Sequence, residues 1–314
     1  MKRAIVISLL VTFFVALTNA LAFSQKPPTQ DKKNDDKQIG IGITEVRLPI
    51  TVKRKAKFLG GLAQSNFEIY EDGKKQAINK FVSPSELPLN VGILIDTSNS
   101  VKLKLPVEKE AADDFAATVT SYRRKDRVLV ASFDSDVELH QDFTASLEQI
   151  SKAIKQLKAS GYTKLFDGVY RVIEEKMATV PDSEARRILV ILSDGEDTAS
   201  DKSLKDAIEI AQRFDVTIFG ISTKNFTGTG AGTVAADPDK ELEMLCEATG
   251  GQVFLPSQKA ELFRSFTEVA EDLRREYVVY YTPSNQDKTG KERKIKVKLL
   301  NAEGDLYHKQ GYVY

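Results

Sequence analysis

The chain has little of the two side chains that build many metal and nucleophile sites. It contains one cysteine, Cys246, and two histidines, His140 and His308, in 314 residues. A single cysteine excludes an intrachain disulfide framework and any cysteine-rich zinc or iron–sulfur site. Two histidines leave little material for a histidine-rich metal centre or a histidine-based triad. We interpret Cys246 as a small core residue and both histidines as surface residues.

An excess of charge of either sign is also absent. Lysine plus arginine and aspartate plus glutamate each number 45, so the formal net charge is zero. A balanced chain lacks the basic surface expected of a general nucleic-acid binder. With 41% hydrophobic residues, the chain is too apolar to be disordered and long enough to bury a sizeable core. We therefore expect a globular protein without a nucleic-acid partner.

The first 22 residues have the pattern of a signal peptide. Two basic residues precede an apolar run over 4–17, and the Ala-Leu-Ala triplet at 20–22 is typical of a cleavage site. Cleavage there predicts a mature start near Phe23. The alternative is a retained anchor, because the run approaches the roughly 20 residues that a membrane span needs. We expect a bacterial exported protein, periplasmic or secreted, with no membrane span after signal cleavage.

Composition divides the rest of the chain into four parts. Residues 23–42 are predicted to be a flexible linker, because QKPPTQDKKNDDKQ has no large apolar residue. Alternating apolar and polar residues predict an N-terminal β segment over 43–86, with a hairpin turn at 71–74. An α/β domain follows over 87–275, and strand patterns return in a C-terminal β segment over 276–314. We expect the two β segments to meet in one small β module.

The α/β domain alternates apolar runs with segments of helical periodicity. The runs are β-branched and apolar on both faces, which is typical of parallel strands covered by helices on each side. The segment 136–143 follows its predecessor after two residues, too few for a crossover helix, so we expect it to pair antiparallel as an edge strand. The sequence predicts a doubly wound, mostly parallel, Rossmann-like sheet. The apolar runs are 91–95, 127–133, 187–192, 216–221 and 252–255.

Small oxygen-bearing residues follow two of these runs. DTSNS (96–100) follows the first, SDGED (193–197) follows the third, and the loop GYTKLFDG (161–168) lies between them in sequence. Ligand sites of open α/β sheets form at the carboxyl ends of the strands. Carboxylate and hydroxyl oxygens without nitrogen or sulfur ligands suit Mg²⁺, or Mn²⁺ in its place. The alternative is that these residues serve only as turn formers and helix caps.

These three elements, in this order, resemble the metal-ion-dependent adhesion site of von Willebrand factor type A domains. The resemblance covers the α/β domain, and the flanking strands are more loosely similar to bacterial exported proteins related to that family. It implies that the hydroxyls of Ser98, Ser100 and, in one state, Thr163 bind the metal directly. It also implies that Asp96 and Asp194 act largely through ordered waters. One metal position would be left for an Asp or Glu carboxylate of a protein partner.

The resemblance favours a metal-dependent binding protein over an enzyme. One alternative is a metal-dependent hydrolase that holds a phosphate ester with the same oxygens, although the sequence offers no evident nucleophile–base pair. The other is a structural protein whose metal site is unused. We interpret Asp167, Glu196 and Asp197 as solvated groups or as supports of the ligands, and the glycine-rich segment 226–233 as a loop near the strand ends.

Overall fold

The structure is a computed structural model. The predicted signal peptide and linker, the glycine-rich loop and Glu196 lie outside the residues that it describes. Within those residues, no helix is both long and apolar enough to cross a membrane. The residues described are 45–55, 57–82, 88–180, 185–194, 197–224, 240–287 and 290–313.

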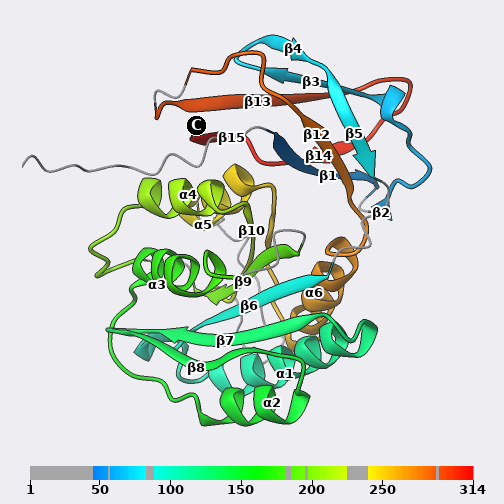
Figure 1. The fold of residues 1–314 in the computed structure, drawn as a ribbon. Helices are drawn as coiled ribbons and strands as arrows, with labels where there is room; N and C mark the ends of the chain where they lie inside the picture. The colour runs from blue at the N-terminus through cyan, green and yellow to red at the C-terminus, as the bar shows by residue number, and fades with distance from the viewer. Residues whose placement is uncertain are drawn as a thin grey trace, which may run out of the picture. The chain divides into compact units, whose positions relative to one another are not determined.

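A six-stranded sheet forms the centre of the α/β domain (Figure 1). All neighbouring strands run parallel except the last two, which are antiparallel and leave the final strand at the edge. The strand Leu89–Asp96, in the middle of the sheet, is buried along its whole length, as expected of a strand covered on both faces. The prediction of an α/β, Rossmann-like domain is therefore confirmed. In spatial order the strands are β11 (Val253–Phe254), β10 (Val216–Ser222), β9 (Arg186–Ser193), β6 (Leu89–Asp96), β7 (Arg127–Phe133) and β8 (Val137–Thr144).

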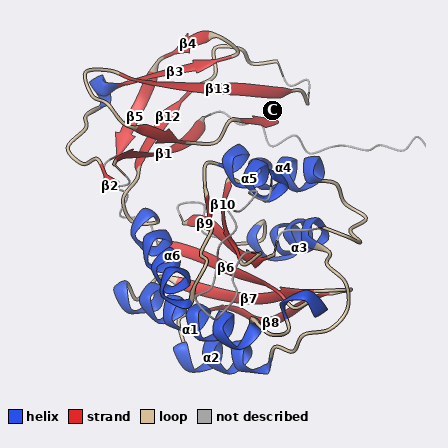
Figure 2. Ribbon diagram, turned by 180° about the vertical axis from the view of Figure 1, so that it is seen from behind, coloured by secondary structure: helices blue, strands red, loops and turns tan. Residues whose placement is uncertain are grey.

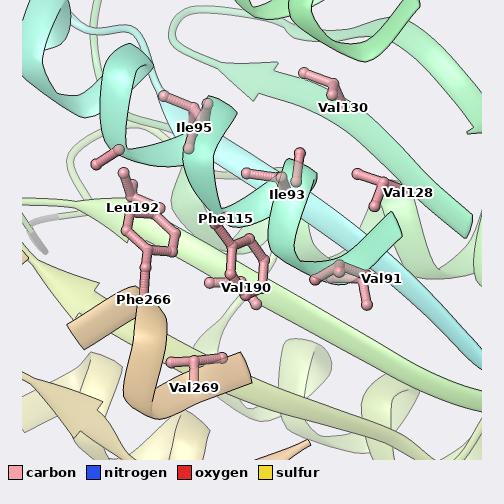
Figure 3. Close-up of a cluster of buried hydrophobic side chains, with 14 of the residues drawn as sticks. Val91, Ile93, Ile95, Phe115, Val128, Val130, Val190, Leu192, Phe266 and Val269 are labelled. Carbon is pink, nitrogen blue, oxygen red and sulfur yellow. The ribbon is translucent and has the colours of Figure 1, made fainter. Parts of the chain in front are cut away.

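Helices cover both faces of this sheet (Figure 2). Alternate residues of β6 divide between the two cores, with Ile93 and Ile95 on one face and Leu94 on the other. On the first face, Phe115 and Phe266 pack with ring centroids 5.1 Å apart above the sheet (Figure 3). The first face is covered by α1 (Leu105–Tyr122), α2 (Leu147–Gln156) and α6 (Lys259–Asp272), and the second by α3 (Leu165–Val172), α4 (Leu204–Arg213) and α5 (Lys240–Thr249).

The strands at the two ends of the chain form two further sheets. In spatial order, one contains β14 (Asp305–Tyr307), β1 (Val46–Arg54), β12 (Tyr277–Tyr281) and β5 (Ile78–Val82), with β2 (Lys57–Phe58) beside β1. The other contains β15 (Gly311–Val313), β13 (Glu292–Leu299), β3 (Phe67–Glu71) and β4 (Lys74–Gln76). Strands from both chain ends pair within each sheet, and side chains of both sheets share one apolar core.

The strands of the two chain ends are thus divided between two sheets, and two segments pass from one sheet to the other. The segments 74–82 and 305–313 each contribute one strand to the first sheet and one to the second. Such sheet-switching segments form the corners between two packed sheets. The hairpin turn lies where the sequence places it, with Asp72 and Gly73 at positive φ between β3 and β4.

Both histidines are more buried than the sequence interpretation predicted, whereas the cysteine lies in the core as predicted. His308 is 8% exposed, because the chain bends there between β14 and β15, and its Nδ1 lies 2.8 Å from the Lys309 carbonyl oxygen. His140 is partly buried, with Nε2 2.8 Å from Ser132 Oγ. Burial lowers the pKa of both histidines. Cys246 lies in the apolar core, as predicted.

Buried ion pairs join the α/β domain to the strands of the chain ends. Arg186, which begins β9, pairs with Glu276 just before β12. Asp215, which precedes β10, accepts from Arg47 of β1 and from Lys309, both at 2.8 Å. Burial acts to raise the pKa of the partly buried Asp215, but Lys309 and Arg47 hold this pKa well below its usual range. Three cations therefore share two carboxylates at this junction.

A buried polar cluster centred on Glu71 connects the two smaller sheets. The Glu71 carboxylate is 2% exposed and accepts from Tyr281 at 2.9 Å and from Tyr312 at 2.8 Å. It also pairs with Arg293 at 2.8 Å. Tyr281 belongs to the first sheet and the other residues to the second. Burial, together with Tyr312 and Glu71, raises the pKa of Tyr281 far above its usual range, so the phenol remains a donor.

We predict that Glu71→Ala destabilises the chain by about 3–5 kcal/mol, because it removes the buried carboxylate that pairs with a buried guanidinium and accepts from two tyrosine hydroxyls. Urea unfolding would measure the free-energy change. Glu68→Ala on the same strand is the control, since the ion pair of Glu68 with Lys75 lies at the surface, and we expect a much smaller effect. Similar losses in the two variants would contradict the role assigned to Glu71.

Candidate metal site

The site is built on a carboxylate at the end of a fully buried strand. Asp96 ends β6 and is 0% exposed. Its Oδ1 accepts from the Ser98 backbone N–H at 2.8 Å, and its Oδ2 accepts from the Ser193 hydroxyl at 2.9 Å. Ser193 ends β9, the neighbouring strand. Both carboxylate oxygens are thus oriented by protein donors, and the loops after the two strands are joined at this residue.

Two serine hydroxyls extend the site from this buried carboxylate toward solvent. A 3₁₀ turn over Asn99–Val101 brings the Oγ atoms of Ser98 and Ser100 to 2.8 Å from each other. Ser98 is 2% exposed, whereas Ser100 is exposed. The pair therefore places one hydroxyl oxygen beside the core and one at the surface.

Thr163 is held at the same edge of the sheet by its loop. Its backbone N–H donates to Thr198 Oγ1 at 3.2 Å, and its carbonyl accepts from the Thr198 N–H at 2.9 Å. The Ser160 N–H donates to the Thr97 carbonyl at 2.7 Å. Gly161 has φ +72°, and a Cβ there would lie 2.4 Å from a side-chain oxygen in the loop after β7. Hydrogen bonds thus fix the loop of Thr163 to the loops that follow β6 and β9. At position 161 only glycine fits, because the loop after β7 lies too close for a side chain.

Two negative charges meet at this edge. Burial raises the pKa of Asp96 to about 6, and the nearby charge of Asp194 contributes to the rise. The hydrogen bonds from Ser98 and Ser193 act in the opposite direction, because they favour the ionised form. A cation between the two carboxylates would offset both the burial and the repulsion.

The donor set fits a hard divalent cation. Within the described residues, no three His, Cys, Asp or Glu side chains gather where they could hold a metal. A cation here would depend on hydroxyl oxygens and water, which suit Mg²⁺ or Mn²⁺. Asp96, Ser98 and Ser100 form one hydrogen-bonded unit, and Asp194 adjoins it directly after Ser193. Thr163 is connected to the unit through the backbone of its loop.

Two acidic residues near the site support its loops. Asp197 accepts from the Phe166 N–H at 3.1 Å and from the Ser200 N–H at 3.0 Å. Asp167 accepts from the Lys202 N–H at 2.8 Å. These bonds connect the loop after β9 to the first turn of α3, which begins two residues after Thr163.

Glu108 on α1 is a buried acid that the sequence analysis did not identify. It is 1% exposed, and within the described residues neither carboxylate oxygen has a hydrogen-bond partner. Burial raises the pKa of Glu108 to about 8, and the charges of Asp96 and Asp194 contribute to this rise. Thr223 and the charge of Lys104 act in the opposite direction and lower the pKa. The carboxyl group is therefore mostly neutral at pH 7, within the electrostatic field of the site.

A signal for this residue is present in the sequence. Glu108 lies four residues before Ala112 and seven before Phe115, both of which are buried on α1. This spacing places it on the apolar stripe of the helix.

The fold and this cluster define an open α/β domain with carboxylate and hydroxyl oxygens at the carboxyl ends of its parallel strands. Residues 90–269 match the family model of the von Willebrand factor type A domain. Because the match covers more than half of the chain, the chain belongs to this family.

Solved structures are similar to the chain at low sequence identity. A von Willebrand factor type A protein from Catenulispora acidiphila is 16% identical, with 79% of this chain and 72% of that chain covered and a TM-score of 0.50. This likeness shows the fold. Proximal thread matrix protein 1 from the mussel byssus, described with a zinc-occupied MIDAS motif, is 18% identical, with 61% of this chain and 49% of that chain covered and a TM-score of 0.47.

One curated protein is related in sequence. A probable bifunctional E2/E3 enzyme of Acanthamoeba polyphaga mimivirus is 27% identical over 191 residues. The alignment covers 57% of this chain and 14% of that protein. The chain therefore spans about a seventh of the length of this relative.

We predict that Glu108→Gln stabilises the metal-free chain at alkaline pH. The pKa of Glu108 is raised from 4.5 to about 8 on folding, so the cost of ionising it is absent below pH 4.5 and complete above pH 8. The variant should match the wild type near pH 4 and exceed its unfolding free energy by about 2–5 kcal/mol at pH 9. Urea unfolding in EDTA at both pH values would measure this difference.

Glu110→Gln is the matched control, because Glu110 lies on the same helix and is exposed. We expect its effect to be small and nearly independent of pH. A Glu108→Gln variant that is less stable than the wild type at pH 9 would show that the buried carboxylate has a partner that it needs.

Proposed function

We propose that the chain is an exported binding protein that holds Mg²⁺ at an adhesion site and uses it to bind an acidic residue of a protein partner. The ligands in this proposal are Asp96, Ser98, Ser100, Thr163 and Asp194. The observation that carries it is the hydroxyl pair of Ser98 and Ser100, which leads from a buried carboxylate to solvent.

The chemistry of the ligands explains why a partner carboxylate would bind. Mg²⁺ bound here would supply a coordination position for that carboxylate. The hydroxyls of Ser98 and Ser100 are neutral, so they leave most of the positive charge available to the partner. Asp96 already accepts two hydrogen bonds from the protein, which favours a role through water over direct ligation. Proteins of this family generally mediate protein–protein interactions, which agrees with this assignment.

A hydrolase is less well supported by the same geometry. The described residues include one serine–histidine contact near the sheet edge, between Ser132 and His140. Ser132 is 5% exposed within β7, so a substrate would not reach its hydroxyl. The carboxylate closest to the ring, Glu138, lies 3.9 Å from Nε2, the nitrogen that already contacts the serine. In a catalytic triad the serine and the carboxylate contact different nitrogens of the histidine ring, so this arrangement is not a triad.

The remaining assignments complete the proposal. We infer that residues 1–22 are a signal peptide and 23–42 a flexible linker, so that the mature protein is periplasmic or secreted. The binding domain would cover 87–275, and the segments 43–86 and 276–314 would form a β module beside it. The pairing of β1 with β12 and of β3 with β13 supports this division.

We predict that millimolar Mg²⁺ or Mn²⁺ raises the melting temperature of the wild type, because a cation that binds only the folded state stabilises it by mass action. The rise should be much smaller in the Ser98→Ala/Ser100→Ala variant, which lacks the two neutral ligands. Differential scanning calorimetry in Mg²⁺ and in EDTA would measure both shifts. Equal shifts in the two proteins would contradict the metal assignment.

We further predict that immobilised mature chain retains a partner from a preparation of exported proteins in Mg²⁺ and releases it in EDTA. Asp194→Asn should lose this partner because it removes one of the two charges that attract the cation. In EDTA, however, the variant should melt at or above the wild-type temperature, since repulsion with Asp96 is relieved. Asp201→Asn is the control, because its side chain is 92% exposed. Retention of the same proteins in EDTA would rule out a metal-dependent interaction.

A further inference from the structure

Two exposed apolar side chains lie on the loops that carry the proposed ligands. Leu103 is 92% exposed and Tyr162 is 71% exposed, the two highest values for large hydrophobic residues in the described part of the chain. Leu103 follows Ser100 by three residues, and Tyr162 directly precedes Thr163. A single exposed leucine is ordinary, but two such residues at one site indicate a contact surface. Tyrosine is also among the residues that contribute most to protein interfaces.

Backbone hydrogen bonds hold these two loops together. The Ser160 N–H donates to the Thr97 carbonyl at 2.7 Å, and the Asn99 N–H donates to the Gly161 carbonyl at 3.2 Å. The segment before Tyr162 is therefore bound directly to the segment that carries the serine ligands. Both apolar side chains then belong to the rim of one site.

A groove adjoins this rim along α1 and the end of α2. Its volume is about 650 Å³. It is continuous with the ligand loops in sequence, because Lys102 and Ala159 in its lining are neighbours of Leu103 and Ser160. The lining of this α1–α2 groove combines apolar residues, such as Leu105 and Ile154, with four lysines and two acidic residues.

The available charge of this groove is positive. Lys102, Lys155 and Lys158 are exposed, and none of them has an ion-pair partner among the described residues. The lining also contains two acidic residues: Glu110 pairs with Lys259 at 2.8 Å, and Asp113 accepts from a serine of α2 but keeps its charge. Four lysines, which include Lys109, outnumber these two carboxylates, so the lining as a whole favours a negatively charged ligand.

We propose that the α1–α2 groove docks an extended acidic segment of the partner protein. This inference rests on the proposed function, because it continues the chain whose carboxylate binds at the metal. One acidic residue occupies the metal position, an apolar residue packs between Leu103 and Tyr162, and further acidic residues lie against Lys102, Lys155 and Lys158. The metal site thus recognises one carboxylate, and the groove selects for the charge of the residues beside it.

Two synthetic twelve-residue peptides test this proposal. Both contain one glutamate followed by leucine, and they differ in a tail of glutamates or of serines. Fluorescence polarisation in Mg²⁺ at physiological ionic strength would measure their affinities. We expect the acidic tail to bind about tenfold or more tightly, since several surface charge pairs act together. The Lys102→Glu/Lys155→Glu/Lys158→Glu variant should lose this preference, and Leu103→Ser should weaken both peptides.

A second triple variant controls for general electrostatic attraction. Lys294→Glu/Lys296→Glu/Lys298→Glu makes the same change in net charge on exposed lysines of β13. It should keep the preference for the acidic tail. An equal loss in both triple variants would overturn the groove proposal, as would equal affinity for the two tails or no binding of either peptide.

The same binding measurements repeated in EDTA separate this proposal from the proposed function. If both tails bind equally in Mg²⁺ and are released by EDTA, the metal function stands and the groove proposal falls. If the preference for the acidic tail persists in EDTA and is lost only in the groove variant, the groove is supported and the metal function falls. Circular dichroism of each variant would confirm that it is folded.

Discussion

The burial of β6 to its last residue is the constraint on which the site depends. Asp96 ends this strand without solvent exposure, so its oxygens need donors within the protein. They find them in the loop that follows and in the hydroxyl that ends β9. These bonds fix the turn that brings Ser98 and Ser100 together. Burial, with a contribution from the charge of Asp194, nevertheless raises the pKa of Asp96 to about 6, so a bound cation would stabilise the ionised carboxylate.

The acidic groups around this edge would make the stability of the site depend on a bound cation. Glu108 is buried nearby with a pKa of about 8, so at pH 7 it contributes little charge beside Asp96 and Asp194. A bound cation would therefore meet two carboxylates. At the junction with the chain ends, by contrast, carboxylates lie against cations, as between Asp215 and Lys309. The junction therefore contains charges of both signs, whereas the edge of the site brings two carboxylates together.

Much of the α/β domain could be predicted, because its signals are local. The apolar run at 127–133 coincides with β7, and the short connection before 136–143 requires the antiparallel pairing seen in β8. The arrangement of the chain ends could not be predicted to the same depth. Alternation showed that strands exist there, but not that 74–82 and 305–313 each pass between two sheets. This bend also places His308 inside, although its sequence neighbours are polar.

The sequence by itself determined the order of strands and helices and the loops that carry Asp96, Ser98, Ser100, Thr163 and Asp194, because periodicity and strand-end motifs are properties of short segments. Only the tertiary structure decided which of these groups touch, how deeply each is buried and which other residues join them. Glu108 and the lysines of the α1–α2 groove acquire their surroundings from segments distant in sequence. Burial, electrostatic field and groove shape are sums over such neighbours, so no local pattern specifies them.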